Sequence, residues 1–182
     1  KESANQREPT LMPGTKARII GGSVAAIAAM AAPMGAYYEG VFPIGYADPV
    51  GIPTDCIGET GPDVVIGKQR FTFDECVARY EPRLQRNWTH GLAMCITRDV
   101  TVPQGAALVS WADNVGIYAA CTSTLVRMLN VGAPPAQWCA QLTQWNKATY
   151  LGTKIVLPGL TKRRASERAM CMGDVDAWRA VA

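Results

Sequence analysis

Histidine is almost absent from this sequence, and its cysteines are widely spaced. His90 is the only histidine, and neighbouring cysteines are 18 to 32 residues apart, so no C-x-x-C pair occurs. Structural zinc sites and Cys–His nucleophiles need such groups at close spacing. The sequence therefore predicts neither a metal site nor a thiol enzyme, and it suggests no organic cofactor.

Signatures of nucleic-acid binding are missing as well. The chain has no zinc-finger spacing and no RNA-binding aromatic motif. Its 182 residues fit one domain, which would bury roughly two thirds of its unfolded surface. We expect a globular, monomeric protein that does not bind nucleic acid.

The net charge of +3 hides an uneven distribution. Residues 37–81 hold eight acidic and three basic side chains, whereas residues 82–182 hold eleven basic and five acidic ones. An acidic lobe facing a basic lobe suits a cleft that holds an anionic polymer near catalytic carboxylates. A solvated basic face accounts for the same counts equally well.

Residues 19–36 form a long uncharged run, which is weakly hydrophobic because it is rich in alanine and glycine. As a helix it would span roughly 27 Å, close to the ~30 Å hydrocarbon core of a bilayer. Lys16 and Arg18 on its N-terminal side would leave residues 1–15, a polar tail, in the cytoplasm. A cleaved signal peptide, a permanent anchor, an anchor that later leaves the bilayer, and a buried core helix all remain open.

Two carboxylates and a hydroxyl follow this run at regular intervals. Glu39 is followed by Asp48 after eight residues and by Thr54 after five more. Cleaving a glycosidic bond needs one carboxyl as acid and a second that activates water or stabilises positive charge. Because Glu39 follows an apolar run, we expect its carboxyl to be shielded from water and to retain its proton, as a general acid must. Asp48 would then be the base or the stabilising carboxylate, and Thr54 would position the attacking water. Acids in a Gly/Pro-rich stretch are more often solvated turn residues.

These residues resemble the active-site hairpin of the phage-type lysozymes, glycoside hydrolase family 24. The signature is Glu, eight residues, Asp, five residues, Thr, and the resemblance resumes in residues 111–116, 122–130 and 157–171. It covers roughly residues 37–172. Members commonly carry a His before the last Thr of this hairpin, whereas this chain has Glu59, a third acid that would shift the pH profile.

The resemblance implies a fold and an activity. The catalytic domain, residues 37–182, would have a two-lobed α+β fold. One lobe would be a small antiparallel sheet, and the larger lobe would be helical. The activity is that of a phage endolysin, a muramidase that hydrolyses the β-1,4 bond between N-acetylmuramic acid and N-acetylglucosamine in peptidoglycan and so lyses the host. Inversion at the anomeric carbon is expected, although spacing in sequence cannot distinguish it from retention.

Within this family the chain is most similar to the signal-arrest-release endolysins. Residues 16–36 would then form a signal anchor that associates transiently with the host inner membrane and delivers the enzyme to the periplasm. Only two residues separate the uncharged run from Glu39, so a run inserted in the membrane would keep Glu39 at the bilayer surface. Release of the run from the membrane would let the catalytic cleft assemble.

Five further residues are predicted to contact substrate. Tyr46 and Glu59 lie in the hairpin. Trp145 and Tyr150 are aromatic residues at a helix-to-loop junction that could stack on sugars, although Trp at helical spacing is more often core. Arg163 lies in a basic segment, Lys162 to Arg164, which is predicted to form the first turn of a helix capped by Thr161. Because cations oppose the helix dipole in a first turn, we expect Arg163 to contact an acid of the hairpin or a carboxylate of peptidoglycan.

Six cysteines in a modest domain indicate disulfides formed in an oxidising compartment, although six buried thiols remain the alternative. Fifteen pairings are possible, and spacing does not choose among them. The resemblance implies three sequential pairs, which are Cys56 with Cys76, Cys95 with Cys121, and Cys139 with Cys171.

Local signals predict the remaining elements. The Gly/Pro-rich stretch after Glu39, with residues 63–67, predicts a small antiparallel sheet. Thr72 and Glu75 form a capping-box pattern that opens a helix toward Trp88, bent at Pro82. Further helices are predicted to begin at Pro103, at Thr122 or Ser123, and at Pro134 or Pro135. A last helix is predicted to open at the turn of residues 157–164 and to end near Cys171.

Three rival functions remain. A peptidoglycan-binding module without activity is kept open by Glu59, and intact Glu39, Asp48 and Thr54 argue against it. A lytic transglycosylase would use Glu39 alone, and the presence of Asp48 argues against that. A membrane-anchored structural protein is disfavoured by the weakness of the apolar run.

Overall fold

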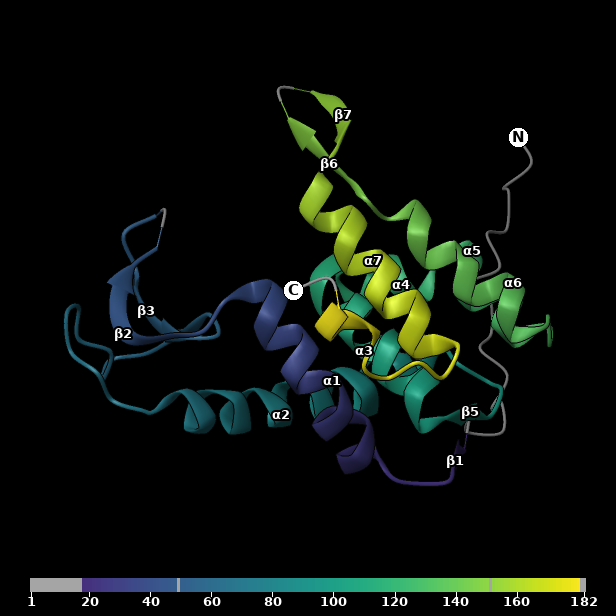
Figure 1. The fold of residues 1–182 in the computed structure, drawn as a ribbon, viewed down its shortest axis with the longest axis horizontal. Helices are drawn as coiled ribbons and strands as arrows, with labels where there is room; N and C mark the ends of the chain where they lie inside the picture. The colour runs from purple at the N-terminus through teal and green to yellow at the C-terminus, as the bar shows by residue number, and fades with distance from the viewer. Residues whose placement is uncertain (1–17, 49, 151, 181–182) are drawn as a thin grey trace, which may run out of the picture.

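Helix α1 (Val24–Glu39) connects the two lobes of the molecule (Figure 1). The computed structural model describes residues 18–48, 50–150 and 152–180, so the predicted tail, residues 1–15, lies outside the described residues. One face of α1 packs against α2 (Phe73–Thr89) and α3 (Val102–Val115). Its side chains there are fully buried, among them Ile27, Ala31 and Met34. The uncharged run is therefore a core helix in this fold.

Caps determine where α1 begins and ends. The Ser23 hydroxyl accepts a hydrogen bond from the Ala26 amide at 3.2 Å, which satisfies one free donor of the first turn. Gly40 follows the last residue with a φ of 79°, and its amide donates to the Ala36 carbonyl at 3.0 Å. Glu39 is thus the last residue of the helix.

The start of the apolar run is not helical. Ile19–Ile20 forms β1, which pairs in parallel with β5 (Val100–Thr101). Gly21, with a φ of 79°, then turns the chain into α1. In the described ranges, 18–48, 50–150 and 152–180, no helix has the length and apolarity to cross a membrane.

The smaller lobe is an antiparallel sheet in the order β2 (Phe42–Ala47), β3 (Pro53–Cys56) and β4 (Glu59–Thr60). The predicted contribution of residues 63–67 is limited to a single bridge between Gly45 and Ile66. Gly45 is required there because a Cβ would lie 2.4 Å from the Val65 carbonyl oxygen.

Helix α2 runs beneath this sheet into the larger lobe (Figure 1). The predicted capping box is present: the Thr72 hydroxyl accepts from the Glu75 amide, and the Glu75 carboxylate accepts from the Thr72 amide at 2.7 Å. Arg83 in this helix donates to the Ile57 carbonyl and to Asp113 of α3, at 2.9 and 3.1 Å. These contacts tie the sheet lobe to the helical lobe.

The helical lobe confirms, to within one residue, three of the predicted helix starts, those of α3, α5 (Thr124–Asn130) and α6 (Pro135–Ala140). Ser123 caps α5, and Pro135 is the first residue of α6. The elements of this lobe not yet named are η1 (Leu92–Met94), α4 (Ile117–Cys121), η2 (Gln141–Gln144), α7 (Pro158–Cys171) and η3 (Ala177–Ala180).

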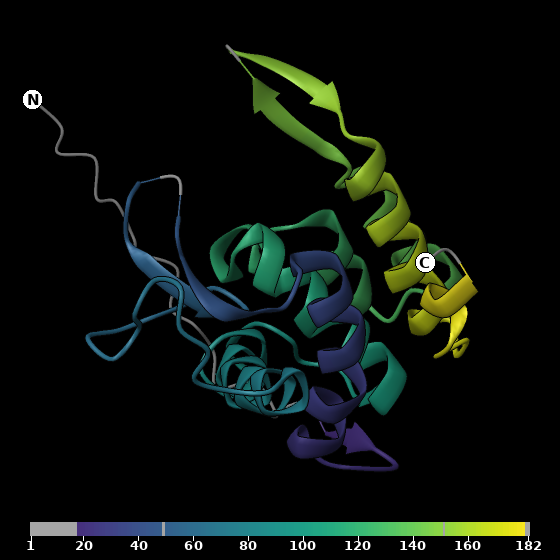
Figure 2. The same cartoon turned by 60° about the vertical axis from the view of Figure 1, so that its left-hand side comes forward.

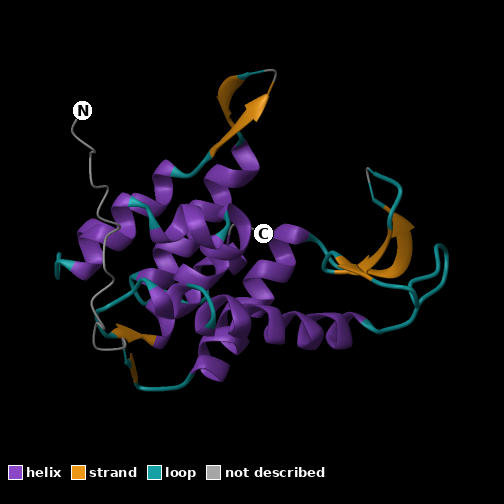
Figure 3. Cartoon of the chain, turned by 180° about the vertical axis from the view of Figure 1, so that it is seen from behind, coloured by secondary structure: helices purple, strands orange, loops and turns teal. Residues whose placement is uncertain are grey.

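A second hairpin, which was not predicted, projects from this lobe (Figures 2 and 3). It consists of β6 (Lys147–Tyr150) and β7 (Thr153–Val156), paired antiparallel. The residues Ala-Thr-Tyr and Lys-Ile-Val flank a turn with Gly152 at a φ of 79°, so β-forming residues around a glycine were the available signal.

The three disulfides expected from the resemblance are present. Cys56 pairs with Cys76, Cys95 with Cys121, and Cys139 with Cys171. The first joins the sheet lobe to α2, and the last joins α6 to α7. Each closes a loop of the unfolded chain, which stabilises the fold by about 2–4 kcal/mol in the chain-entropy account.

Gly35 allows α1 and α2 to approach closely, and this gives a testable prediction. A Cβ at Gly35 would lie 2.6 Å from Cε1 and 2.8 Å from the hydroxyl of Tyr80, which is buried. We expect Gly35→Ala to lower the free energy of unfolding by about 1–3 kcal/mol, measured by urea titration.

Gly159→Ala is the matched control, because Gly159 also lies in a helix but has no atom near its Cβ position. It should be neutral or slightly stabilising. Equal effects of the two substitutions would contradict the close-packing explanation.

Candidate active site

Glu39 projects from the last turn of α1 into a cavity of about 430 Å³ that lies between α1, α3 and the start of α7. The cavity is lined by Tyr38, Glu39, Asn114, Leu157, Pro158, Gly159, Leu160 and Arg163. The Glu39 carboxylate accepts a hydrogen bond from Nη1 of Arg163 on α7. Its side chain is 34% exposed. The expectation of a dry acid is therefore wrong: Glu39 sits at the mouth of the cavity in an ion pair.

Asp48 lies in the turn between β2 and β3. Its Oδ1 accepts hydrogen bonds from the amides of Val50 and Ile52 at 2.9 and 2.8 Å. Among the described residues, no protein group donates to Oδ2. The turn thus orients the carboxylate and leaves one oxygen able to bind water.

Thr54 and Tyr46 are cross-strand partners behind this turn. Thr54 is buried, and its hydroxyl donates to the Ile52 carbonyl at 2.9 Å. The ring of Tyr46 packs on Phe42 with centroids 5.1 Å apart. In this state Thr54 braces the turn that holds Asp48.

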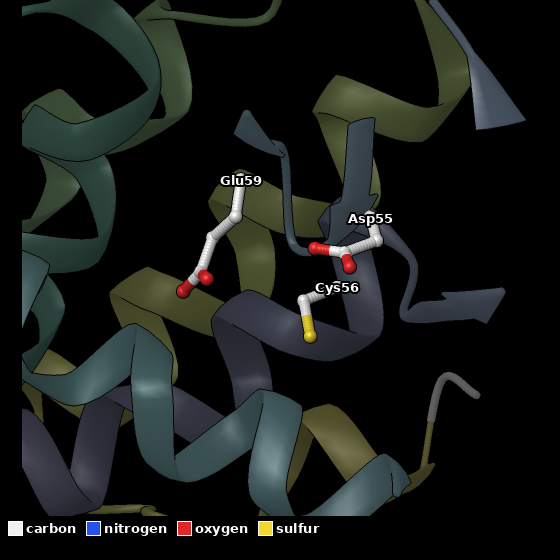
Figure 4. A group of neighbouring side chains, drawn as sticks. All are labelled: Asp55, Cys56 and Glu59. Carbon is white, nitrogen blue, oxygen red and sulfur yellow. The ribbon is translucent and has the colours of Figure 1, made fainter. Parts of the chain in front are cut away.

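Glu59 does not act as an unpaired third acid. Its carboxylate accepts from Arg79 of α2 at 2.7 Å, and Arg79 also stacks over Phe71. Neighbouring Asp55 is fully buried and pairs with Arg70 at 2.8 Å. Asp55, Cys56 and Glu59 lie close together (Figure 4), but the cysteine is in a disulfide and both acids are neutralised by arginine. The group therefore does not suit a metal ion.

The basic segment of α7 differs from the prediction. Leu157 precedes the helix and Pro158 is its first residue, so Thr161 lies inside it and donates to the Leu157 carbonyl. Arg163 belongs to the second turn, and its side chain is only 4% exposed. The predicted contact with an acid of the active-site segment is nevertheless present, because Arg163 pairs with Glu39.

Trp145, one of the predicted aromatic contacts, is less accessible than expected. Trp145 is half-buried, with its ring packed edge-on against the buried Trp111 at 5.3 Å. Tyr150 is the last residue of β6. Trp145 is therefore part of the core edge, as Trp at helical spacing usually is.

Sequence reasoning missed three polar residues around Arg163. Glu167 is fully buried and accepts from Arg163 Nε at 3.1 Å and from the Ser110 hydroxyl at 3.0 Å. Asn114 accepts from Arg164 at 2.7 Å. The spacing of the two arginines to Glu167, four and three residues on one helix, was the available signal.

Known proteins resemble this chain in sequence and in fold. Residues 36–167 match the protein family described as phage lysozyme. The chain belongs to the phage lysozyme family. It is 37% identical over 166 residues to the SAR-endolysin of Enterobacteria phage P21, covering 90% of this chain and 96% of the relative. The SAR-endolysin of Enterobacteria phage PA-2 is 36% identical over the same coverage.

Solved structures agree with this assignment. The endolysin of Escherichia coli O157:H7 phage FAHEc1 superposes with a TM-score of 0.66 at 26% identity, covering 79% of this chain and 91% of that one. The muramidase domain of SpmX from Asticaccaulis excentricus gives 0.67 at 25% identity, with 78% and 94% covered. The protein is thus a phage endolysin of the lysozyme type, a glycoside hydrolase with the predicted two-lobed α+β fold.

The different burial of Glu59 and Asp55 predicts different costs of removing them. We expect Glu59→Ala to change the free energy of unfolding by about 0.2–1 kcal/mol, because its ion pair with Arg79 is partly exposed. Activity should be retained. Asp55→Ala should cost more, about 1–3 kcal/mol, because it removes a fully buried carboxylate that accepts two hydrogen bonds from Arg70.

Thermal unfolding and lysis assays on the two variants would check this. A Glu59→Ala enzyme that folds normally but is inactive would contradict the interpretation that Glu59 only forms an ion pair with Arg79 and takes no part in catalysis.

Proposed function

We propose that this endolysin hydrolyses the β-1,4 bond between N-acetylmuramic acid and N-acetylglucosamine with Glu39 as general acid. The observation that carries the proposal is the carboxyl at the end of α1, held by a buried arginine at the mouth of a cavity between α1, α3 and α7. The family membership and the Glu–Asp–Thr spacing support it.

The contacts of Glu39 suit proton donation. As the proton moves to the leaving sugar oxygen, negative charge develops on the carboxylate. The Arg163 guanidinium, which is already in place, stabilises that charge without reorganising. The ion pair is thus more favourable in the transition state than before proton transfer, which is the condition for catalysis.

Asp48 is proposed as the second carboxylate. Two backbone amides fix Oδ1, and Oδ2 can accept a proton from the attacking water. Thr54 is proposed to help position that water, with its hydroxyl turning from the Ile52 carbonyl when substrate is bound. Tyr46 and the aromatic side chain of residue 150 remain proposed sugar contacts.

The nature of the product ends tests this proposal. Purified Gram-negative peptidoglycan is digested with the wild type, with Glu39→Gln and with Asp48→Asn, and the muropeptides are analysed by mass. We expect reducing N-acetylmuramic acid ends from the wild type and a loss of about 10²–10⁴-fold in rate for Glu39→Gln, the range for a general acid.

Each rival function gives a different result. Anhydro ends, with Asp48→Asn still active, would identify a lytic transglycosylase. Sacculi that are bound but not cleaved by any form would identify a binding module.

We also propose that the enzyme reaches the periplasm by a transient stay of residues 19–36 in the host inner membrane. The names of its relatives support this, and so does the composition of α1, which is apolar but weakly hydrophobic. In the folded domain the same residues pack against α2 and α3. While they were inserted, Glu39 would be kept away from Arg163.

Changing the exposed face of α1 separates membrane retention from folding. Ala25 and Ala29 are exposed on α1, so replacing both with Leu should strengthen insertion without disturbing the core. Gly21 and Gly22 are poorer sites, because Gly21 has a positive φ and a Cβ at Gly22 would lie 2.5 Å from Val102.

We expect the double Leu variant to remain in the membrane fraction and to delay lysis, whereas the matched Ala25→Ser, Ala29→Ser variant should be released. Unchanged release of the Leu variant, with normal folding, would contradict the membrane step.

A further inference from the structure

A carboxylate that the proposed mechanism does not use lies at the centre of a buried ionic cluster. Glu167 is fully buried in α7. Its Oε1 accepts hydrogen bonds from Arg163 Nε at 3.1 Å and from Ser110 at 3.0 Å. Its Oε2 lies 3.1 Å from Arg164 Nη1. One acid therefore pairs with two arginines, by a hydrogen bond to Arg163 and by an ion pair without hydrogen-bonding geometry to Arg164.

Arg163 lines the active-site cavity, and Arg164 binds a residue that lines it. Arg163 Nη1 donates to Glu39, and Nη2 donates to the Ser110 carbonyl at 3.3 Å. Arg164 Nη2 donates to Oδ1 of Asn114 at 2.7 Å. Glu39 and Asn114 line the same cavity, from α1 and α3. Both exposed polar groups of this cavity wall are thus connected to Glu167 through one arginine each.

The charges explain why the cluster is organised in this way. Arg163, Arg164 and Glu167 alone would leave one excess positive charge in a buried place, and Glu39 balances it. Burial raises the pKa of Glu167 and lowers the pKa of Arg164, the direction expected when charged groups leave water. A hydrophobic core would fill the same volume at no such cost, which points to a role beyond stability.

We propose that Glu167 is a positioning residue, which holds Arg163 against Glu39 and Arg164 against Asn114 and so sets the geometry of the catalytic wall. Without it, Arg163 would move to satisfy its freed Nε, and Glu39 would lose its fixed orientation. Asn114, freed from Arg164, would lose the orientation in which its amide can bind the polar substituents of a sugar. The proposal rests on the function proposed above, with Glu39 as the acid.

The first test replaces Glu167 with Gln, which keeps the shape and removes the charge. Activity is measured on soluble peptide-free glycan chains of alternating N-acetylglucosamine and N-acetylmuramic acid, well below the melting temperature of each variant. We expect kcat to fall about 10- to 100-fold, as displacement of a catalytic group of about 1 Å does. Asn114→Ala should instead mainly raise KM.

A double-mutant cycle with Arg163→Lys asks whether Glu167 acts through Arg163. If it does, Glu167→Gln should lower kcat much less in the Arg163→Lys background than in the wild type. Independent, multiplicative losses would overturn the proposal. Should Glu167→Gln fail to fold, Glu167→Asp takes its place in the cycle, because it keeps the charge and shortens the reach.

Leu125→Ala controls for instability. Leu125 is fully buried in α5 and lines no part of the cavity, so this variant should lower the melting temperature with little change in kcat. A Glu167→Gln enzyme that behaves in the same way would reduce Glu167 to a structural role and overturn the proposal. The wild type and Glu39→Gln are measured in the same assay. If Glu39→Gln remained active, the proposed function itself would be wrong, and this result is distinct from an inactive Glu39→Gln with a fully active Glu167→Gln.

Discussion

The ion pair between Glu39 and Arg163 is the contact on which the active site depends. It joins the last residue of α1 to the second turn of α7, two segments that are 124 residues apart. Arg163 is held from behind by Glu167, and Glu39 is fixed by the glycine cap that ends its helix. The catalytic wall therefore forms only when the first and last long helices are both packed in the helical lobe.

The weak hydrophobicity of α1 follows from how closely it is packed. Where it meets its neighbours there is no room for larger groups: Gly35 lies against Tyr80, and Gly105 of α3 lies against Ile27. More Leu on the packed face of this helix would not fit. The same small side chains make the segment a poor permanent anchor. Close packing in the domain and release from a bilayer would both favour small, weakly hydrophobic side chains. Because both roles favour the same composition, the sequence alone left four interpretations of this run.

Local signals predicted most of the elements. The capping box at Thr72, the Ser123 cap and the prolines at helix starts depend on residues adjacent in sequence, and each was confirmed. The disulfides came from the family resemblance. The hairpin of residues 147–156 was missed although its turn glycine and β-forming residues were visible.

The environments of Glu39, Glu59 and Arg163 were mispredicted for another reason. An apolar run before Glu39 suggested a dry site, but the partner that decides its environment comes from α7. Glu59 is neutralised by Arg79, twenty residues away, and Arg163 was taken as a first-turn cation although it is buried. Such non-local pairs depend on tertiary packing, which residue spacing does not encode.

A crystal structure of the Glu39→Gln enzyme with a bound glycan fragment would test the central claim most directly. The account predicts that the oxygen of the bond to be cleaved lies within about 3 Å of the residue 39 amide, with the sugar in the cavity lined by Asn114 and Leu160. A glycan bound elsewhere, with residue 39 out of hydrogen-bonding reach of any glycosidic oxygen, would contradict the assignment of Glu39 as the acid.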